Sequence, residues 1–303
     1  MDKKQLTAKL KRKTASGAYS LLRFVLIFGL AFIILRPIIY RFLVAFMSPS
    51  DLLDSSVSMI PKNWSTYYWN VAIEGLELAK SVPNTLFLSG GVAILQVISC
   101  LLVGYGLGRF KFPGSNLAFV LVIIIMLIPN QVIGTAQYLG FVYFDIGPWT
   151  LNLADSFWPM FILAFTGLGI KEGLYIYLFK EQFAAMPKNL EEAAYIDGAG
   201  VFKTFLTVML PNVRTTIATV FLFSFCWQWT DQTYSGLYLA GTEVLATQIS
   251  HVTVKVGLTV DQYGMIISRG AATLLIMLPL LLLFVFCQKF LVQSIARTGL
   301  SDS

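Results

Sequence analysis

The sequence predicts an all-α protein that crosses a membrane about six times. Of its 303 residues, 56% are hydrophobic and 13% are charged, whereas a soluble domain carries roughly 25% charged residues. A water-soluble chain of this composition would expose large apolar patches, which promote aggregation. The apolar residues also gather in runs of about 20 or more, the length that lets an α-helix cross a hydrocarbon core about 30 Å thick.

Six apolar runs define the expected membrane domain, residues 21–293. Its helices are expected near residues 21–47, 85–108, 117–140, 157–183, 204–228 and 271–293. Pro37 lies inside the first run and Pro129 interrupts the third, and a membrane helix tolerates proline where neighbouring groups satisfy the freed carbonyl. The fourth run is the least apolar, because it holds Lys171 and Glu172.

The chain begins with a basic tail, residues 1–20, that carries six Lys and Arg residues in its first thirteen positions. A cleaved signal peptide also begins basic and turns apolar. However, the apolar run from Leu21 to Met47 is too long for the core of a signal peptide, and no small-x-small cleavage site follows it. We therefore expect an uncleaved first helix.

The charges of the loops predict the orientation. Basic residues recur in alternate loops and at the C-terminal end: Arg109, Lys111, Lys188, Lys203, Lys289 and Arg297. The opposite loops are mainly acidic: Asp51, Asp54, Glu74, Glu77, Asp145, Asp155, Asp231, Glu243 and Asp261. Because basic loops stay in the cytoplasm, both termini, including the final tail 294–303, are expected on that side of a bacterial cytoplasmic membrane.

The composition also excludes several classes of function. The net charge of +6 is concentrated in the tail and gives no sign of nucleic-acid binding. The three cysteines lie within apolar runs, and with a single histidine they provide neither a disulfide framework nor metal-ligand spacing. No Gly-x-x-x-x-Gly-Lys-Ser/Thr phosphate-binding loop or nucleophile elbow occurs. The chain alone is therefore not expected to be an enzyme or to bind a cofactor.

The segment with the clearest local pattern is residues 187–200, between the fourth and fifth runs. Asn189 can cap a short helix whose first turn holds Glu191-Glu192, where the helix dipole favours negative charge. Ala193-Ala194 would give that helix a small, smooth face. Both an ordinary capped cytoplasmic loop and a helix that docks another protein fit this pattern.

Two glycines, Gly198 and Gly200, end this segment. Glycine reaches backbone dihedrals that other residues resist, so the pair predicts a sharp change of direction before a second helix that starts at Val201. The short helix would then be joined rigidly to two spans, and it could carry a push from a partner protein into the membrane.

The segment resembles the EAA loop of ABC importer permeases, through Glu192-Ala193-Ala194, three residues, Gly198, nine residues and Val208-Met209-Leu210-Pro211. Other stretches are similar to the MalG-like branch of carbohydrate permeases: Pro61–Ser65 with Tyr68, Asn84-Thr85-Leu86, Gly104–Gly114, Ile128-Pro129, Glu191–Gly198 and Trp229-Thr230-Asp231. The resemblance covers most of the chain. It departs at the end, where Val292–Gly299 replaces the Gly-Leu-Thr-x-Gly-like tail that reaches the ATPase in the family.

The resemblance implies a type I ABC importer fold and a set of partners. This chain and a MalF-like permease would form the pathway within membrane lipid, and a solute-binding protein would deliver the ligand from outside. A dimer of ATPase subunits would bind ATP and Mg and hydrolyse ATP. Coupling to the ATPase is implied for Glu191, Glu192, Ala193, Ala194, Asp197, Gly198 and Gly200. The implied solute is an oligosaccharide or another sugar.

Two groups of residues are candidates for the solute pathway. The first is the intramembrane pair Lys171 and Glu172, since ionisable residues within spans mark pathways by default; a local bend or a pairing with another helix is the alternative. The second is an aromatic and polar group at the outer end of the fifth run: Trp227, Trp229, Asp231 and Tyr234. Aromatic faces stack on sugar rings, and a membrane-interface belt explains these residues equally well.

Two alternative interpretations share many of these features. Permeases for polyamines, phosphate esters or peptides have the same EAA loop, so the solute class rests on the flanking resemblances. An ion-coupled secondary transporter would work alone and would show inverted repeats or several intramembrane carboxylates. Neither is evident in the sequence, and such a protein would leave the segment 187–200 unexplained.

Overall fold

The structure is a computed structural model that describes residues 3–256 and 259–298. Helices make up most of this part of the chain, as the sequence predicts. Two short antiparallel hairpins accompany them: β1 (Phe144–Ile146) with β2 (Trp149–Leu151), and β3 (Lys255–Val256) with β4 (Thr259–Val260). The chain forms two compact units: residues 1–73 with 252–274, and residues 74–251 with 275–303.

Helix α1 (Lys3–Val44) dominates the first unit. It continues through most of the predicted tail, so the first helix is longer than the apolar run itself. Its stretch Tyr19–Val44 is long and apolar enough to cross a membrane, and none of the most apolar window is buried within the described chain. Such a helix is stable only where lipid or another protein chain covers it.

The rest of the first unit is a folded connection formed by η1 (Asp51–Leu53), the start of α2 (Tyr67–Leu76) and the start of α14 (Gln262–Thr298). The buried Asp51 carboxylate accepts hydrogen bonds from the backbone N–H groups of Lys62, at 3.0 Å, and Asn63, at 2.9 Å. Because a charged acceptor makes stronger hydrogen bonds than a neutral one, this side chain fixes the path of the connection between α1 and α2.

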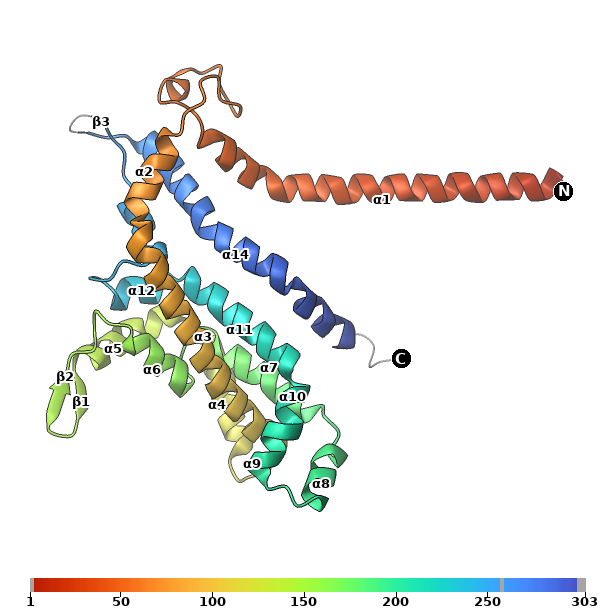
Figure 1. Ribbon diagram of the computed structural model, residues 1–303, viewed down its shortest axis with the longest axis vertical. Coiled ribbons are helices and arrows are strands. Elements are labelled where there is room, and N and C mark those ends of the chain that lie inside the picture. The colour runs from red at the N-terminus through yellow and green to blue at the C-terminus, as the bar shows by residue number, and fades with distance from the viewer. Residues whose placement is uncertain (1–2, 257–258, 299–303) are drawn as a thin grey trace. The chain divides into compact units, whose positions relative to one another are not determined.

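The second unit contains the remaining elements. In chain order they are α3 (Leu78–Arg109), α4 (Ser115–Leu127), α5 (Asn130–Val142), α6 (Trp158–Thr166), α7 (Glu172–Ala184), α8 (Asn189–Ile196), α9 (Val201–Thr204), the π-helical turn η2 (Phe205–Met209), α10 (Leu210–Asn212), α11 (Arg214–Trp229), α12 (Thr233–Tyr238), α13 (Leu245–Gln248) and η3 (Ile249–His251). Helix α3 is central, with its most extensive packing against α7 and α11 (Figure 1).

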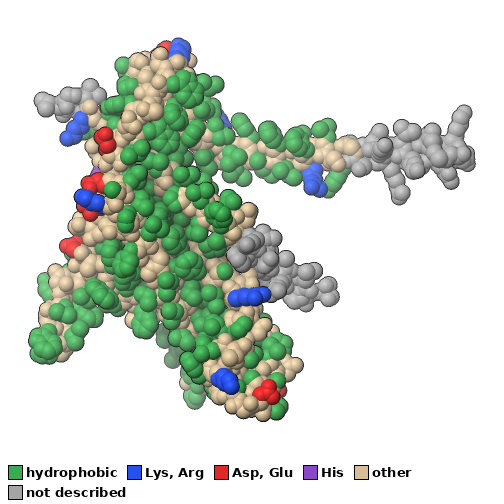
Figure 2. Space-filling view, in the orientation of Figure 1, with side chains coloured by type: hydrophobic (Ala, Val, Ile, Leu, Met, Phe, Trp, Pro, Cys, Tyr) green, Lys and Arg blue, Asp and Glu red, His purple; other side chains and the backbone are tan. Residues whose placement is uncertain are grey.

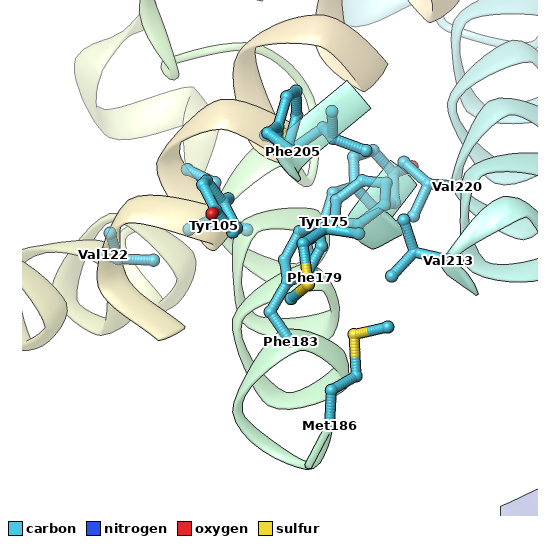
Figure 3. Close-up of a cluster of buried hydrophobic side chains, with 13 residues drawn as sticks. Tyr105, Val122, Tyr175, Phe179, Phe183, Met186, Phe205, Val213 and Val220 are labelled. Atoms are coloured by element: carbon cyan, nitrogen blue, oxygen red, sulfur yellow. The ribbon is translucent and has the colours of Figure 1, made fainter. Parts of the chain in front are cut away.

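Two glycines of α3 allow it to pack closely on α7. A Cβ atom on Gly104 would lie 2.5 Å from the Cβ of Phe179, and one on Gly108 would lie 2.8 Å from the carbonyl oxygen of Lys180. Glycines four residues apart bring helix backbones together in membranes, where packing replaces the hydrophobic effect as the driving force. Beside this contact, a core of buried side chains forms where α3, α7, η2 and α11 meet (Figure 3).

The membrane helices are less continuous than the sequence predicts. Among the residues that the structure describes, three helices are long and apolar enough to cross a membrane: Tyr19–Val44, Leu78–Arg109 and Gln262–Gln288. The count rises to five if each of two bent pairs is one span: α4 with the body of α5, bent by 103°, and Val201–Asn212 with α11, bent by 74°. The predicted runs at 117–140 and 204–228 are therefore bent pairs. Pro129 precedes α5 and Pro211 lies inside α10, and proline interrupts helical hydrogen bonding.

The predicted fourth span, 157–183, is also broken, into α6 and α7. Gly167 ends α6 with φ +85°, and Lys171 precedes α7 with φ +60°. Both values lie in the left-handed region, which glycine adopts readily and lysine does not. The local bend considered for Lys171 and Glu172 is therefore present, and the sixth crossing stays a prediction.

The surface agrees with a membrane environment. Figure 2 shows that hydrophobic side chains cover most of the visible face and that charged side chains are few. The exposed apolar residues include long stretches of α3, α4 and α14. All three cysteines are free thiols, as their positions in the sequence indicate.

Candidate coupling segment and membrane cavity

The segment 187–200, here called the coupling segment, contains the short helix that the sequence predicts. Helix α8 begins at Asn189 and holds Glu191 and Glu192 in its first turn. No side-chain cap is present: the N–H groups of both glutamates donate to the carbonyl of Lys188, at 3.0 and 3.1 Å. The expectation that Asn189 caps this helix was therefore wrong, because Asn189 is itself the first helical residue.

The exit from α8 depends on one glycine. Gly198 adopts φ +78°, and its N–H donates to the carbonyl of Tyr195 at 3.0 Å. The N–H of Ala199 donates to the carbonyl of Ala194 at 2.9 Å. These two bonds form the Schellman motif that ends many helices with a left-handed glycine. Gly200 has φ −74° and ψ 169°, an extended conformation that any residue adopts. The turn predicted from two glycines is made by the first of them.

The inner face of α8 is fixed to α3 by a buried ion pair. The Glu191 carboxylate accepts hydrogen bonds from Arg109, whose Nε lies 2.8 Å away and whose second contact, through Nη2, is shorter. The side chains of Arg109 and Glu191 are only 4% and 13% exposed. Arg109 also donates to the carbonyl of Met186 at 2.8 Å, and the hydroxyl of Tyr105 donates to Glu191 at 3.1 Å. In the sequence, Arg109 contributes to the predicted orientation and lies in the stretch Gly104–Gly114 that resembles the MalG-like branch, but its contact with Glu191 was not predicted.

Aromatic packing extends this joint into the core of the second unit. The Tyr105 ring lies 4.7 Å from the ring of Phe205, in η2, and 5.2 Å from that of Phe183, in α7 (Figure 3). The end of α3 therefore contacts both the helix before the coupling segment and the helix after it.

The outer face of the coupling segment is exposed and carries both charged and apolar side chains. Glu192, Ala193 and Asp197 are exposed, and Ala194 is half-buried. Ile196 is 86% exposed and Phe202, just beyond the turn, is 72% exposed. One charged side chain, Glu191, is thus buried, while large apolar side chains are exposed beside the charged Glu192 and Asp197. Contiguous exposed apolar residues mark a surface that binds protein or membrane.

A cavity of about 840 Å³ brings together most of the proposed pathway residues. Five of the six line it, although they come from two segments that are far apart in the sequence: Lys171, Glu172, Trp227, Asp231 and Tyr234. The sixth candidate lies elsewhere: Trp229 is 1% exposed, and its indole N–H donates to the carbonyl of Ile276 at 3.0 Å. Trp229 is thus a packing residue that joins α11 to α14.

Glu172 belongs to a buried polar network at the start of α7. Its carboxylate accepts a hydrogen bond of 2.6 Å from the hydroxyl of Ser99, in α3, and another from the N–H of Gly169. Next to it, the amide of Gln96 donates to the carbonyl of Ile170 at 3.1 Å and accepts from the hydroxyl of Ser224. Unpaired polar groups are costly in lipid, so this network stabilises the break between α6 and α7. Both alternatives considered for Glu172, a local bend and a pairing with another helix, are present.

Asp231 is occupied by the first turn of α12. Its carboxylate accepts hydrogen bonds from the N–H of Ser235 at 2.7 Å, from its hydroxyl at 3.1 Å, and from the N–H of Thr233 at 3.2 Å. Burial raises the pKa of Asp231, although these hydrogen bonds act in the opposite direction. Asp231 is therefore a helix cap that faces the cavity.

Lys171 and Trp227 form the remaining pair in the cavity. The Lys171 ammonium lies 5.1 Å from the centroid of the Trp227 ring, within the range of a cation–π contact. Trp227 is 50% exposed, in contrast to the buried Trp229. Within the described residues, no cluster of three His, Cys, Asp or Glu side chains could hold a metal ion.

These features define a class of protein: a multi-pass membrane protein with a cavity at one set of helix breaks and a short, exposed helix at another. Residues 101–297 match the family described as "Binding-protein-dependent transport system inner membrane component". The match includes more than half of the chain, and the chain belongs to this family. It is therefore a permease component of a binding-protein-dependent importer, within the MalG-like branch that its motifs resemble.

Known permeases are similar to this chain along nearly its whole length. The chain is 27% identical over 298 residues to the maltodextrin transport system permease protein MalD of Streptococcus pneumoniae, covering 96% of this chain and 97% of that protein. It is 26% identical over 287 residues to the osmoprotective compounds uptake permease protein GgtD of Synechocystis sp., covering 89% of each. It also superposes with a TM-score of 0.65 on a chain of a bacterial ABC transporter that imports the acidic polysaccharide alginate, covering 91% of this chain and 97% of that one at 18% identity. The fold is thus the type I importer fold.

Proposed function

We propose that this chain is one of two permease subunits of an ATP-driven importer for an oligosaccharide or another sugar. Helix α8 docks on an ATPase subunit, one of a dimer that binds ATP and Mg. A MalF-like permease completes the pathway, and a solute-binding protein delivers the sugar to the side opposite the termini, which lie in the cytoplasm. The observation that carries the proposal is the coupling segment, which is fixed from inside by Arg109 and Glu191 and exposes apolar side chains, among them Ile196, on its outer face.

The contacts of the coupling segment support a mechanical role. A displacement of α8 reaches α3 through the ion pair, and it reaches the end of α7 because Arg109 also holds the carbonyl of Met186. A buried charge-assisted pair is short, directional and little screened by salt. Closure of an ATPase dimer on ATP would therefore move α3 and α7 together with α8. In this proposal Glu192, Ala193, Ala194 and Asp197 contact the ATPase, and Gly198 sets the turn.

The sugar assignment is supported by the relative named for maltodextrin transport and by the exposed tryptophan in the cavity. The relative named for the uptake of osmoprotective compounds has a name that specifies no sugar. A polyamine, a phosphate ester or a peptide is therefore the alternative solute.

The first test is the composition of the complex. The tagged chain is solubilised gently from its native membranes and the co-purifying proteins are identified by mass spectrometry. We expect an ATPase and a second permease. Repeated recovery of the chain alone would contradict the proposal and favour an ion-coupled transporter.

The second test addresses the solute. The purified complex and its binding protein are reconstituted in liposomes, and ATP-dependent uptake is compared for maltodextrin, raffinose, an alginate oligosaccharide and sn-glycerol 3-phosphate. We expect uptake of at least one of the three carbohydrates. Uptake of the phosphate ester alone would replace the sugar assignment and leave the importer assignment intact.

A further inference from the structure

The cavity that holds Lys171 and Trp227 lies where three helix pairs are interrupted. It is lined by Ile128-Pro129 between α4 and α5, by Leu168–Lys171 between α6 and α7, and by Thr230–Gln232 between α11 and α12. Non-helical backbone at membrane depth is tolerated where it is buried in protein or lines a water-filled cavity, and broken helices accompany binding sites in transporters. A volume of about 840 Å³ also falls within the range of small-molecule sites, about 300–1,000 Å³.

The charged side chains of this cavity differ in how fully their hydrogen-bonding groups are already paired. Glu172 is engaged by Ser99 and Gly169, and Asp231 is engaged by the first turn of α12. Within the described part of the chain, the Lys171 ammonium forms no salt bridge and instead covers the Trp227 ring. Lys171 is thus the cavity's readily exchangeable donor.

The backbone aims Lys171 at Trp227. The residue sits in the left-handed region, φ +60°, which is unfavourable for a side chain of this type. The neighbouring Glu172 maintains that conformation, because its carboxylate is bonded back to the N–H of Gly169 and across to α3. The Glu172 network is therefore a positioning device for the Lys171 ammonium.

We propose that one sugar ring of the solute binds in this cavity, stacked on the Trp227 indole, while Lys171 leaves the ring face and donates hydrogen bonds to the sugar's oxygen atoms. A sugar ring has a C–H face that packs on an aromatic ring and hydroxyl oxygens that accept from an ammonium group. In the structure the ammonium covers the face that the sugar would use, so the two compete for it. This inference rests on the proposed function, whose substrate contact it names.

The test uses the reconstituted complex and the same carbohydrate probes, with Trp227→Leu and Trp227→Phe. We expect Trp227→Leu to lower uptake about tenfold, the equivalent of about 1.4 kcal/mol. Trp227→Phe retains an aromatic face and should keep uptake within about threefold of the original chain. The control is Trp158→Leu, at a tryptophan that is 61% exposed and does not line the cavity. Uptake by Trp227→Leu equal to that of the control would overturn the proposal.

A second pair of variants examines the lysine. Lys171→Met removes every donor and should raise the apparent KM about fivefold, whereas Lys171→Gln keeps an N–H donor and should raise it about twofold. Equal KM values for Lys171→Met and the original chain would contradict a role for the ammonium in sugar binding. ATPase activity stimulated by the binding protein should stay within about twofold in the control Trp158→Leu, because Trp158 lies in neither the cavity lining nor the coupling segment.

Protection from labelling provides a readout that does not depend on transport. Gln232→Cys places a thiol at an exposed position of the cavity lining. We expect saturating sugar to slow the reaction of this thiol with a maleimide, compared with the same variant without sugar. The unsubstituted chain gives the background labelling of the three native cysteines. Unchanged labelling in a complex that imports the sugar would overturn the subsite alone. Absence of carbohydrate uptake by the unsubstituted complex would contradict the sugar assignment, and with it the subsite.

Discussion

The coupling segment and the cavity each contain a buried carboxylate and a basic side chain, but they use them differently. In the coupling segment, a buried carboxylate and arginine hold a short helix in place while its apolar residues face outward. In the cavity, a buried carboxylate stabilises broken backbone while an ammonium and an indole face the open space. In the proposed roles, the first region has to be stiff, and the second has to leave groups free to change partners. Differences between matched variants in the two regions therefore separate force transmission from solute binding.

The largest effect is expected at the ion pair of the coupling segment. Arg109→Met leaves the Glu191 carboxylate buried without its charge partner, and breaking such a pair costs about 3–5 kcal/mol. We expect loss of sugar uptake and of most co-purified ATPase. The control Lys111→Met removes an exposed charge two residues away and should leave both unchanged. Normal ATPase recovery with Arg109→Met would show that the pair does not hold the docking helix.

The second-largest effect is expected on thermal stability, at the contact between α3 and α7, the two helices that contribute to both regions. Gly104→Ala would place a Cβ 2.5 Å from that of Phe179, whereas Gly106→Ala meets nothing within 4 Å. Overpacking costs about 1–3 kcal/mol. In thermal unfolding of the purified chain, Gly104→Ala should lower the midpoint and Gly106→Ala should not. Equal midpoints would mean that α3 and α7 are not this close in the membrane.

A smaller effect is expected at the end of α8. Gly198→Ala forces alanine into a left-handed conformation, at a cost of about 1 kcal/mol, whereas Gly200→Ala occupies an extended one. We expect ATPase recovery to fall several-fold for Gly198→Ala and to remain normal for Gly200→Ala. A similar loss for both variants would indicate that Gly200 itself contacts the ATPase.

The smallest effect distinguishes the two tryptophans at the end of α11. Trp229→Phe removes the indole N–H that satisfies the buried carbonyl of Ile276 and should reduce stability by about 1 kcal/mol. The apparent KM for sugar should not change, because Trp229 does not line the cavity. A rise in KM without loss of thermal stability would place Trp229 in the pathway after all.

The comparison of the coupling segment with the cavity also explains which features were predictable from the sequence. The coupling segment is continuous, so its acidic first turn and its left-handed Gly198 were predictable from local pattern. Its anchor was not, because Arg109 meets Glu191 only after two helices pack together. The bent helices at Pro129, which lines the cavity, and at Pro211, in α10, had a signal in the sequence that was underestimated. A local bend was considered at Lys171, but the network behind it was not predictable, because it depends on Ser99 and Gln96 from another helix.

Tertiary packing also decides which of the six pathway candidates line the cavity. An aromatic pattern indicates which residues can face a sugar but not which of two tryptophans points inward. Trp227 and Trp229 are two residues apart, so they point to nearly opposite sides of α11. Only tertiary packing decides that one is half-exposed in the cavity and the other is sealed against α14.

The most direct test of the central claim is site-specific photocrosslinking from the outer face of α8 in native membranes. A photoreactive amino acid replaces Ile196, which is 86% exposed, and a matched probe replaces Phe28 of α1, which is 63% exposed. We predict that the Ile196 probe captures a protein that carries the phosphate-binding loop of an ATPase and that the Phe28 probe does not. Capture of lipid alone at Ile196, in a complex that still imports its solute, would contradict the assignment of this segment as the coupling helix.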